Sequence, residues 1–204
     1  MIGIVNYGSG NIYAITNIYN RLGIPHILTD DHEELKKADK LILPGVGAFD
    51  ETMDLLNKSG LKGLLDELVT VQKKPIIGVC VGMQIMAKGS EEGDKEGFGW
   101  INGTVKKIDK NLLSQKPHLP HMGWNSTSPK KESKLLKDIN HEIGFYFLHT
   151  YYLFVENEKD TLTTTDYGQE FTSSVNCDNV YGVQFHPEKS HSNGIQVFKN
   201  FAEL

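Results

Sequence analysis

The sequence of 204 residues contains few cysteines, and it lacks an apolar run long enough to cross a membrane. Cys80 and Cys177 are the only two cysteines, whereas a chain held together by disulfides has more of them in fewer residues. The longest nearly apolar window, Ile76 to Ala87, is well short of the about 20 residues of a transmembrane helix, and Gln84 interrupts it. These absences predict a protein of a reducing compartment without a membrane partner.

The N-terminus lacks the features of a secretory signal. No basic residue precedes Arg21, and the first residues contain no long apolar core. We therefore expect a cytoplasmic protein.

An excess of positive charge is missing as well. The formal net charge is −5, and the lysines are scattered along the chain. Binding to nucleic acid depends on clustered positive charge that displaces counterions from the phosphates. A nucleic-acid partner is therefore not expected.

Signals for metals and other cofactors are weak. His118 and His121 are separated by a proline, and His186 belongs to the candidate catalytic group described below. Gly8-Ser9-Gly10 follows the first predicted strand, as in dinucleotide-binding proteins, but Tyr13 stands where the third glycine is required. We expect no metal and no other cofactor.

Apolar segments alternate with amphipathic ones in the first half of the chain. Apolar runs at residues 2–5, 26–28, 41–43 and 76–79 predict buried strands. Between them, apolar residues recur at helical spacing, as in residues 12–22 before Gly23. Because alternating strands and helices require crossover connections, the predicted fold class is α/β, with a doubly wound, mostly parallel sheet and helices on both faces.

After Gly97 the pattern changes to short apolar runs separated by turns, which is typical of antiparallel strands. These runs cover residues 103–108, 145–148, 151–155, 161–165, 171–175 and 180–185. A last helix is predicted over residues 192–202. We expect additional antiparallel strands in the C-terminal half of a single domain, residues 1–204.

The stretch Gly78-Val79-Cys80-Val81-Gly82 has the spacing of a nucleophile elbow, in which the reactive residue lies in a tight turn from a strand to a helix. A cysteine at that place lies at the N-terminus of a helix, whose free N–H groups stabilise a thiolate. Free cysteines are also often small, buried apolar side chains. The elbow alone does not decide between these two readings.

A nucleophilic thiol needs a base and an acid that orients the base. His186 and Glu188 end a predicted strand and are two residues apart, with a proline between them that fixes the backbone. In extended geometry residues i and i+2 point the same way, so Glu188 can hold one nitrogen of His186 while the other addresses Cys80. This predicts a Cys-His-Glu triad.

An oxyanion that develops during the reaction needs N–H donors. The N–H of Val81, next to the nucleophile, is one candidate. The segment Pro44-Gly45-Val46-Gly47, at the carboxyl end of a neighbouring predicted strand, is the other. An ordinary tight turn is the alternative reading of that segment.

Three segments together resemble class I glutamine amidotransferases. They are residues 44–49 (PGVGAF), 78–84 (GVCVGMQ) and 186–190 (HPEKS). Residues 122–125 (MGWN) and 146–151 (YFLHTY) are similar to the glutaminase subunits of imidazole glycerol phosphate synthases. The resemblance extends from residue 6 to the end of the chain. It implies a flavodoxin-like glutaminase fold.

The resemblance also implies a reaction: hydrolysis of glutamine to glutamate and ammonia through a thioester on Cys80. His186 would protonate the departing ammonia, and Glu188 would complete the triad. Gly47 and Val81 would supply the oxyanion hole. Gln84 would help to hold the substrate.

A partner follows from the same resemblance, since the chain has no second domain to use the ammonia. In the family the ammonia passes to a (β/α)8-barrel cyclase of histidine biosynthesis, which forms a heterodimer with the glutaminase. Asn11, Trp124, Tyr146 and Lys189 are the implied interface or gating positions. The two aromatic residues could equally be packing residues, and Lys189 a solvated charge.

Departures from the family pattern leave other functions open. Asn6 stands where the family often has Asp, Val81 stands where Leu is usual, and residues 97–100 (GFGW) are unusual for a histidine-pathway member. Similar variants resemble paralogues that supply ammonia to a sugar amidotransferase in surface-polysaccharide synthesis. Two further alternatives are a cysteine hydrolase of the same fold that acts on other amides, and a non-catalytic interaction module.

Overall fold

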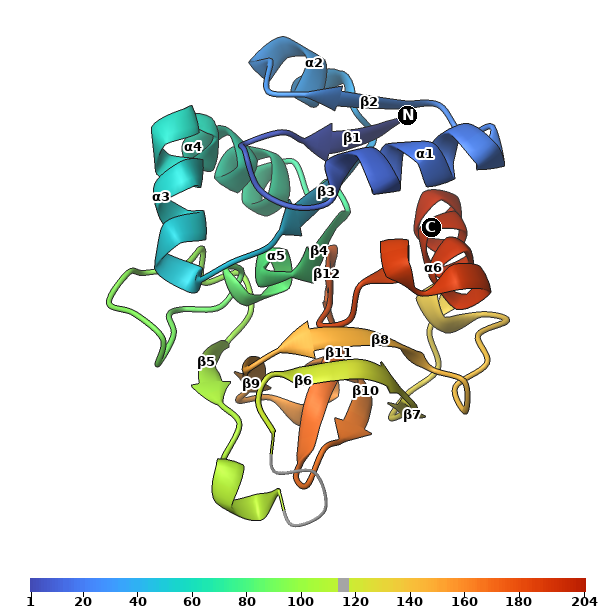
Figure 1. Cartoon of the computed structure of the whole chain (residues 1–204). Helices are drawn as coiled ribbons and strands as arrows, with labels where there is room; N and C mark the ends of the chain where they lie inside the picture. The colour runs from blue at the N-terminus through green and yellow to red at the C-terminus, as the bar shows by residue number, and fades with distance from the viewer. Residues whose placement is uncertain (114–117) are drawn as a thin grey trace.

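A sheet of eight strands runs through the molecule, seen in a computed structural model that describes residues 1–113 and 118–204 (Figure 1). The strand order is β2-β1-β3-β4-β12-β11-β10-β7. The first five strands of this order are parallel. They are β1 (Ile2–Val5), β2 (His26–Thr29), β3 (Lys40–Gly45), β4 (Ile76–Cys80) and β12 (Val180–Val183).

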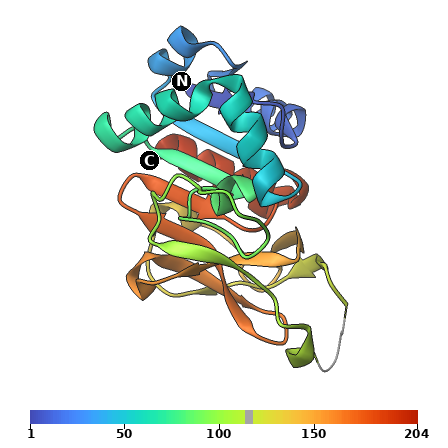
Figure 2. The same cartoon turned by 90° about the vertical axis from the view of Figure 1, so that its left-hand side faces the viewer.

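Helices cover both faces of the parallel strands. The first and last helices, α1 (Ile12–Leu22) and α6 (His191–Glu203), lie on one face, and α3 (Phe49–Ser59) and α4 (Leu61–Asp66) lie on the other (Figures 1 and 2). A π-helical segment, Glu67–Val71, continues α4. The short helices are α2 (His32–Lys37) and α5 (Val81–Gln84). This arrangement confirms the predicted α/β fold class.

Two helix ends follow directly from the sequence. Gly23 ends α1 in the left-handed conformation, with φ 65°, which glycine adopts without steric cost. Asp31 caps α2, since its side chain accepts a hydrogen bond from the N–H of Glu34 at 2.9 Å.

The C-terminal half adds antiparallel strands, as predicted. The main sheet is extended by β11 (Glu170–Cys177), β10 (Thr161–Asp166) and β7 (Ser128–Pro129). Two separate pairs lie beside it, β5 (Gly103–Lys107) with β9 (Tyr151–Val155), and β6 (His121–Asn125) with β8 (Phe145–His149). Short 3-10 turns cover Lys110–Leu112, Lys134–Leu136, Glu158–Asp160 and Pro187–Lys189.

Several elements differ from the sequence-based expectation, among them β7, whose two residues are too few to show a pattern. The run at residues 180–185 was expected among the antiparallel additions, but β12 is parallel to β4 and antiparallel only to β11. This makes β12 the strand at which the parallel and antiparallel parts of the sheet meet. Strand β6 was not predicted, because its exposed residues Met122 and Trp124 obscure the alternation of apolar and polar residues.

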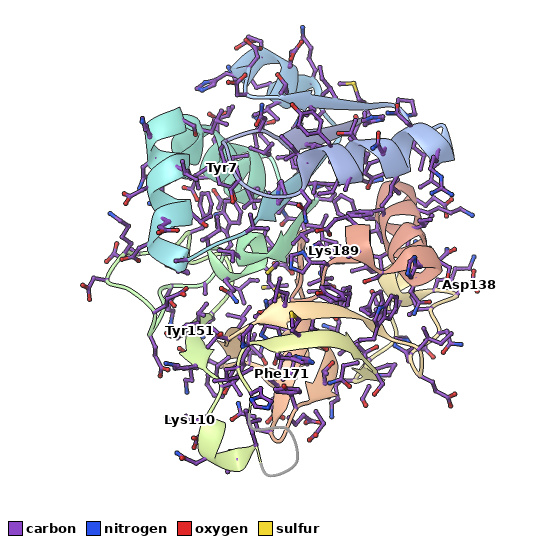
Figure 3. All side chains as sticks on the ribbon, in the orientation of Figure 1. Tyr7, Lys110, Asp138, Tyr151, Phe171 and Lys189 are labelled. Atoms are coloured by element: carbon purple, nitrogen blue, oxygen red, sulfur yellow. The ribbon has the colours of Figure 1, made fainter. Side chains whose placement is uncertain are left out.

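Apolar side chains fill the space between the sheet and the helices (Figure 3). All five residues of β4 are buried, as expected for a central parallel strand. Tyr19 of α1 packs on Phe198 of α6 and donates its hydroxyl to the Phe198 carbonyl at 3.2 Å, which joins the two helices. In the antiparallel half, Phe145 stacks on Phe185 with ring centroids 3.7 Å apart. Both halves therefore meet in one continuous core.

Candidate active site

The candidate nucleophile lies where β4 turns into α5. Cys80 has φ 56° and ψ −115°, a conformation that is costly for a residue with a side chain. The flanking glycines are required by close contacts: a Cβ atom on Gly82 would lie 1.9 Å from the Leu43 carbonyl oxygen, and one on Gly78 would lie 2.6 Å from that of Gly82. The structure thus places Cys80 in the tight strand-to-helix turn that the sequence predicts.

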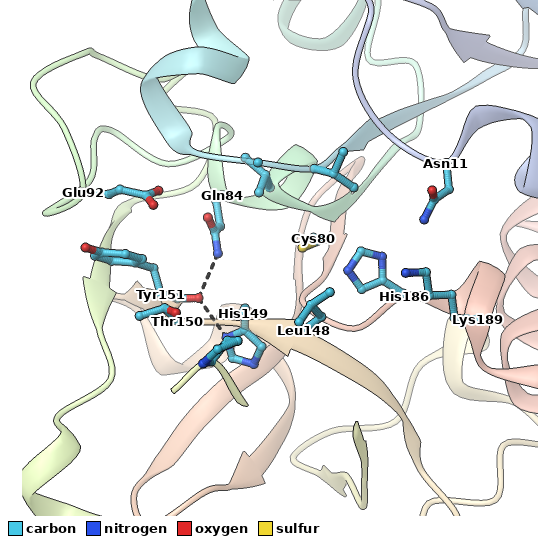
Figure 4. Close-up of a pocket in the computed structure, with 14 residues that line it drawn as sticks. Asn11, Cys80, Gln84, Glu92, Leu148, His149, Thr150, Tyr151, His186 and Lys189 are labelled. Carbon is cyan, nitrogen blue, oxygen red and sulfur yellow. Dashed lines mark hydrogen bonds between the residues drawn. The ribbon is translucent and has the colours of Figure 1, made fainter. Parts of the chain in front are cut away.

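His186 and Glu188 meet this cysteine from the turn after β12. The Nδ1 atom of His186 lies 2.8 Å from the Glu188 carboxylate, and both side chains are buried. The ring also faces Cys80 across the same cavity wall (Figure 4). Asn11 donates its side-chain N–H to the same Glu188 oxygen at 2.8 Å. The structure therefore brings the three predicted triad residues together and adds Asn11 behind them.

The surroundings of His186 and Glu188 shift the pKa of each of these two residues. Burial alone would lower the pKa of His186, but the neighbouring Cys80 and the hydrogen-bonded Glu188 outweigh burial and raise the pKa to about 10. Burial works to raise the pKa of Glu188, but the hydrogen bond and charge of His186 and the hydrogen bond of Asn11 lower it. At neutral pH the imidazole is therefore protonated and the carboxylate is charged.

A cavity of about 470 Å³ opens beside the nucleophile (Figure 4). Most predicted site residues reach its wall. Its lining includes Asn11, Val46, Gly47, Cys80, Val81, Gln84, Glu92, Pro120, residues 148–151, His186 and Lys189. In Figure 4, Cys80 lies between Gln84 and His186, so that a bound molecule would contact the sulfur and both side chains. The volume is in the range of small-molecule sites.

The segment after β3 forms one wall of the cavity beside the sulfur. Gly45 is paired with Cys80 in the parallel register, and Gly47 has φ 101°, which favours glycine. The hydroxyl of Ser9 bonds to both sides of the Val46 residue, to its N–H at 2.9 Å and to its carbonyl at 3.0 Å. The hydroxyl of Tyr7 donates to the Pro44 carbonyl. The loop after β1 thus fixes the predicted oxyanion segment.

Gln84 lies in a chain of hydrogen bonds below the cavity. Its Nε2 atom donates to the Tyr151 carbonyl at 2.9 Å and to Oε1 of Gln184 at 3.0 Å. Both N–H groups are therefore used, and Oε1 of Gln84 is left as an acceptor. The Nδ1 atom of His149 lies 2.9 Å from the same Tyr151 carbonyl, as the dashed lines in Figure 4 show.

Two residues of the site were not found from the sequence. Glu92 brings a carboxylate to the cavity wall and accepts the N–H of Phe49 at 2.9 Å. It lies in the charged stretch after residue 88, which reads as an exposed loop. Gln184 precedes the triad histidine by two residues, and its Nε2 atom lies 3.8 Å from the Cys80 sulfur. Its position between two buried apolar residues is the signal that could have identified it.

Three of the expected interface or gating residues lie together on one side of the triad. Trp124 and Tyr146 are paired across β6 and β8, and the Lys189 ammonium lies 5.6 Å from the Tyr146 ring centroid. Trp124 is 43% exposed and stacks on His191. The fourth residue, Asn11, instead contacts Glu188.

In residues 1–113 and 118–204, no cluster of three or more His, Cys, Asp or Glu side chains could hold a metal, and no helix could span a membrane.

Comparison with known proteins gives matches over nearly the whole chain. Residues 4–204 match the family model "Glutamine amidotransferase class-I". The chain is 47% identical over 204 residues to the "Imidazole glycerol phosphate synthase subunit HisH" of Leptospira borgpetersenii, covering 100% of both proteins. It is 46% identical over 204 residues to "subunit HisH 2" of Pseudomonas aeruginosa, again covering 100% of both.

Solved structures share the fold at lower sequence identity. PurLQS from Thermotoga maritima has a TM-score of 0.75 at 16% identity, covering 99% of this chain and 97% of that one. A structure described as a glutamine amidotransferase has a TM-score of 0.73 at 16% identity, covering 100% and 99%. The family match and the full-length relatives show that the chain belongs to the class I glutamine amidotransferase family.

Proposed function

We propose that this chain is the glutaminase subunit of an imidazole glycerol phosphate synthase, which hydrolyses glutamine and supplies ammonia to a partner subunit in histidine biosynthesis. The observation that carries the proposal is the contact of Cys80, His186 and Glu188 in a chain whose full-length relatives have that name. The proposal includes a cytoplasmic location and one glutaminase domain over residues 1–204. The sugar amidotransferase and the hydrolase of other amides are not favoured, since the full-length relatives are HisH subunits.

The geometry suggests the following reaction. The Cys80 sulfur attacks the side-chain carbonyl carbon of glutamine as a thiolate, while the proton that it has given up is held by His186. His186 then gives this proton to the departing nitrogen as the C–N bond breaks, which leaves a γ-glutamyl thioester and ammonia. Water hydrolyses the thioester and returns a proton to His186, so that glutamate leaves and the thiolate and imidazolium are restored. Glu188 keeps the imidazole oriented throughout and balances its charge.

The oxyanion is assigned to backbone N–H groups beside the sulfur. Val81 begins α5 directly after the nucleophile, and Gly47 lies on the facing wall of the same cavity. Fixed donors at this place stabilise the negative oxygen of the tetrahedral intermediate more than the carbonyl of the substrate. The hydrogen bonds between Ser9 and the Val46 backbone hold the segment that carries the Gly47 donor.

Gln84 and Glu92 are assigned to the recognition of glutamine. Both line the cavity, and both offer acceptors there, an amide oxygen and a carboxylate. Glutamine carries two donor groups, the α-ammonium and the side-chain amide. Acceptors at these two positions would bind both donors and would disfavour glutamate, whose side chain ends in a carboxylate where glutamine has the amide.

The partner is proposed to be a (β/α)8-barrel synthase subunit that binds next to the triad. Trp124, Tyr146 and Lys189 form an aromatic and cationic surface there, and Met122 is 65% exposed on the same strand as Trp124. Aromatic and methionine side chains are enriched at protein interfaces, as Trp124 and Met122 would be here. Asn11 is better assigned to positioning Glu188 than to direct partner contact.

Reconstitution with the synthase subunit tests the proposed function. The unaltered complex is expected to form imidazole glycerol phosphate with either glutamine or ammonium salt as nitrogen source. Cys80→Ala should lose at least about 10³-fold of the glutamine-dependent rate and keep the ammonium-dependent rate, because only the thiol step is removed. Cys177→Ala is the matched control and should keep both rates. Equal loss with both nitrogen sources would contradict the proposal.

Replacing Gln84 by methionine tests substrate recognition. The variant keeps the length of the side chain but loses its acceptor oxygen, so the KM for glutamine should rise about 10- to 100-fold. The kcat should change much less, and Gln72→Met, at an exposed position outside the cavity, should change neither constant. An unchanged KM in steady-state assays would instead support a hydrolase that acts on other amides.

Nitrogen NMR of the histidine rings tests the assigned proton donor. At pH 7.5 His186 should be an imidazolium, because its pKa of about 10 means that it loses the proton only as the pH rises through that value. His149 should be neutral, since burial lowers its pKa to about 3. Glu188→Gln removes a charge that raises the pKa of His186, so its titration should move to lower pH while His149 is unchanged. A neutral His186 at pH 7.5 would refute the assignment.

A further inference from the structure

Gln184 lies beside the nucleophile because of the register of two neighbouring strands. Strands β12 and β4 are parallel, and Val183 pairs with Val79, so the next positions along the two strands are Gln184 and Cys80. Side chains at paired positions point to the same face of the sheet. Gln184 is fully buried, and its Nε2 atom lies 3.8 Å from the Cys80 Sγ atom.

The orientation of the Gln184 amide follows from one backbone carbonyl. The Tyr151 oxygen can only accept a hydrogen bond, so Gln84, at 2.9 Å, must present its NH₂ group to it. The second N–H of that group then meets Oε1 of Gln184 at 3.0 Å. Since the oxygen of Gln184 is bound in this way, its NH₂ group faces the sulfur.

His149 holds the same carbonyl from the other side. Its Nδ1 atom must donate to the Tyr151 oxygen, at 2.9 Å, so its Nε2 atom accepts from Nδ1 of His121 at 3.0 Å. The pKa of His149 is lowered to about 3, mainly by burial, so the ring stays neutral and keeps this pattern at neutral pH. The carbonyl that orients both glutamines is therefore fixed by a second, independent donor.

We propose that Gln184 is a further catalytic residue, whose side-chain N–H donates a hydrogen bond to the Cys80 sulfur and stabilises its thiolate. The inference rests on the proposed cysteine chemistry and extends it. Gln184 transfers no proton: the thiol proton still goes to His186 and from there to the departing ammonia. Its N–H acts when charge is on sulfur, which is before the attack and again when water expels the thiolate from the thioester.

A purely structural role for Gln184 makes a different prediction. If Gln184 serves only to hold Gln84, its loss should resemble the loss of Gln84 and should raise the KM for glutamine. If it acts on the sulfur, its loss should change the reactivity of the thiol toward a reagent that does not use the glutamine site. Iodoacetamide is such a reagent, because it alkylates the thiolate directly.

The test measures the rate of alkylation of Cys80 by iodoacetamide as a function of pH, with the chain in its complex. All variants also carry Cys177→Ser, so that Cys80 is the only thiol of this chain that can be alkylated. Gln184→Met should slow alkylation at pH 6 about tenfold and move the midpoint of the profile upward by about one pH unit. Gln184→Glu keeps the shape and an acceptor toward Gln84 but brings negative charge to the sulfur, so its shift should be larger. The matched control, Gln72→Met at an exposed position outside the cavity, should keep the unaltered profile.

Profiles of Gln184→Met and Gln184→Glu that coincide with the unaltered one would overturn the inference and leave the glutaminase proposal intact. An unaltered protein whose Cys80 is not alkylated at all would contradict the glutaminase proposal itself.

A second measurement uses the unaltered chain and needs no substitution at residue 184. The side-chain amide protons of Gln184 should shift in NMR spectra when Cys80 is alkylated, and signals that stay in place would overturn the inference.

Discussion

The parallel register of three neighbouring strands is the constraint on which the site depends. Gly45 of β3 and the position of Gln184 after β12 flank Cys80 at the carboxyl end of β4. The turn after Cys80 fits only because backbone atoms approach more closely than a Cβ atom on Gly82 would allow. The cost of the strained cysteine is thus offset by close packing on both sides.

Electrostatics divides the site into a charged side and a neutral side. On one side, Cys80 and Glu188 favour the charged form of His186, and His186 and Asn11 favour the charged form of Glu188 through the same carboxylate oxygen. On the other side, His149 and the two glutamine amides stay neutral and fix the orientation of donors and acceptors. A substrate between the two sides would meet a proton donor on one side and oriented acceptors on the other.

The local features of the site could be predicted from the sequence because each rests on a short pattern. Three features can be read from neighbouring residues in this way: the glycines around Cys80, the spacing of His186 and Glu188, and the alternation of strands and helices. Glu92 and Gln184 could not be predicted in the same way, since their roles depend on contacts between distant segments. Strand β12 was assigned to the antiparallel group because periodicity along one strand does not reveal the direction of its neighbours. The contact of Asn11 with Glu188 joins residues that are 177 positions apart, so it could not be predicted from a short pattern either.

Affinity labelling shows whether the cavity presents glutamine to the sulfur of Cys80. The complex would be treated with a γ-glutamyl chloroketone, and the modified residue identified by peptide mass spectrometry. The account predicts one adduct, on Cys80, whose formation an excess of glutamine prevents. An adduct on Cys177 alone, or no adduct in the presence of the partner, would contradict it.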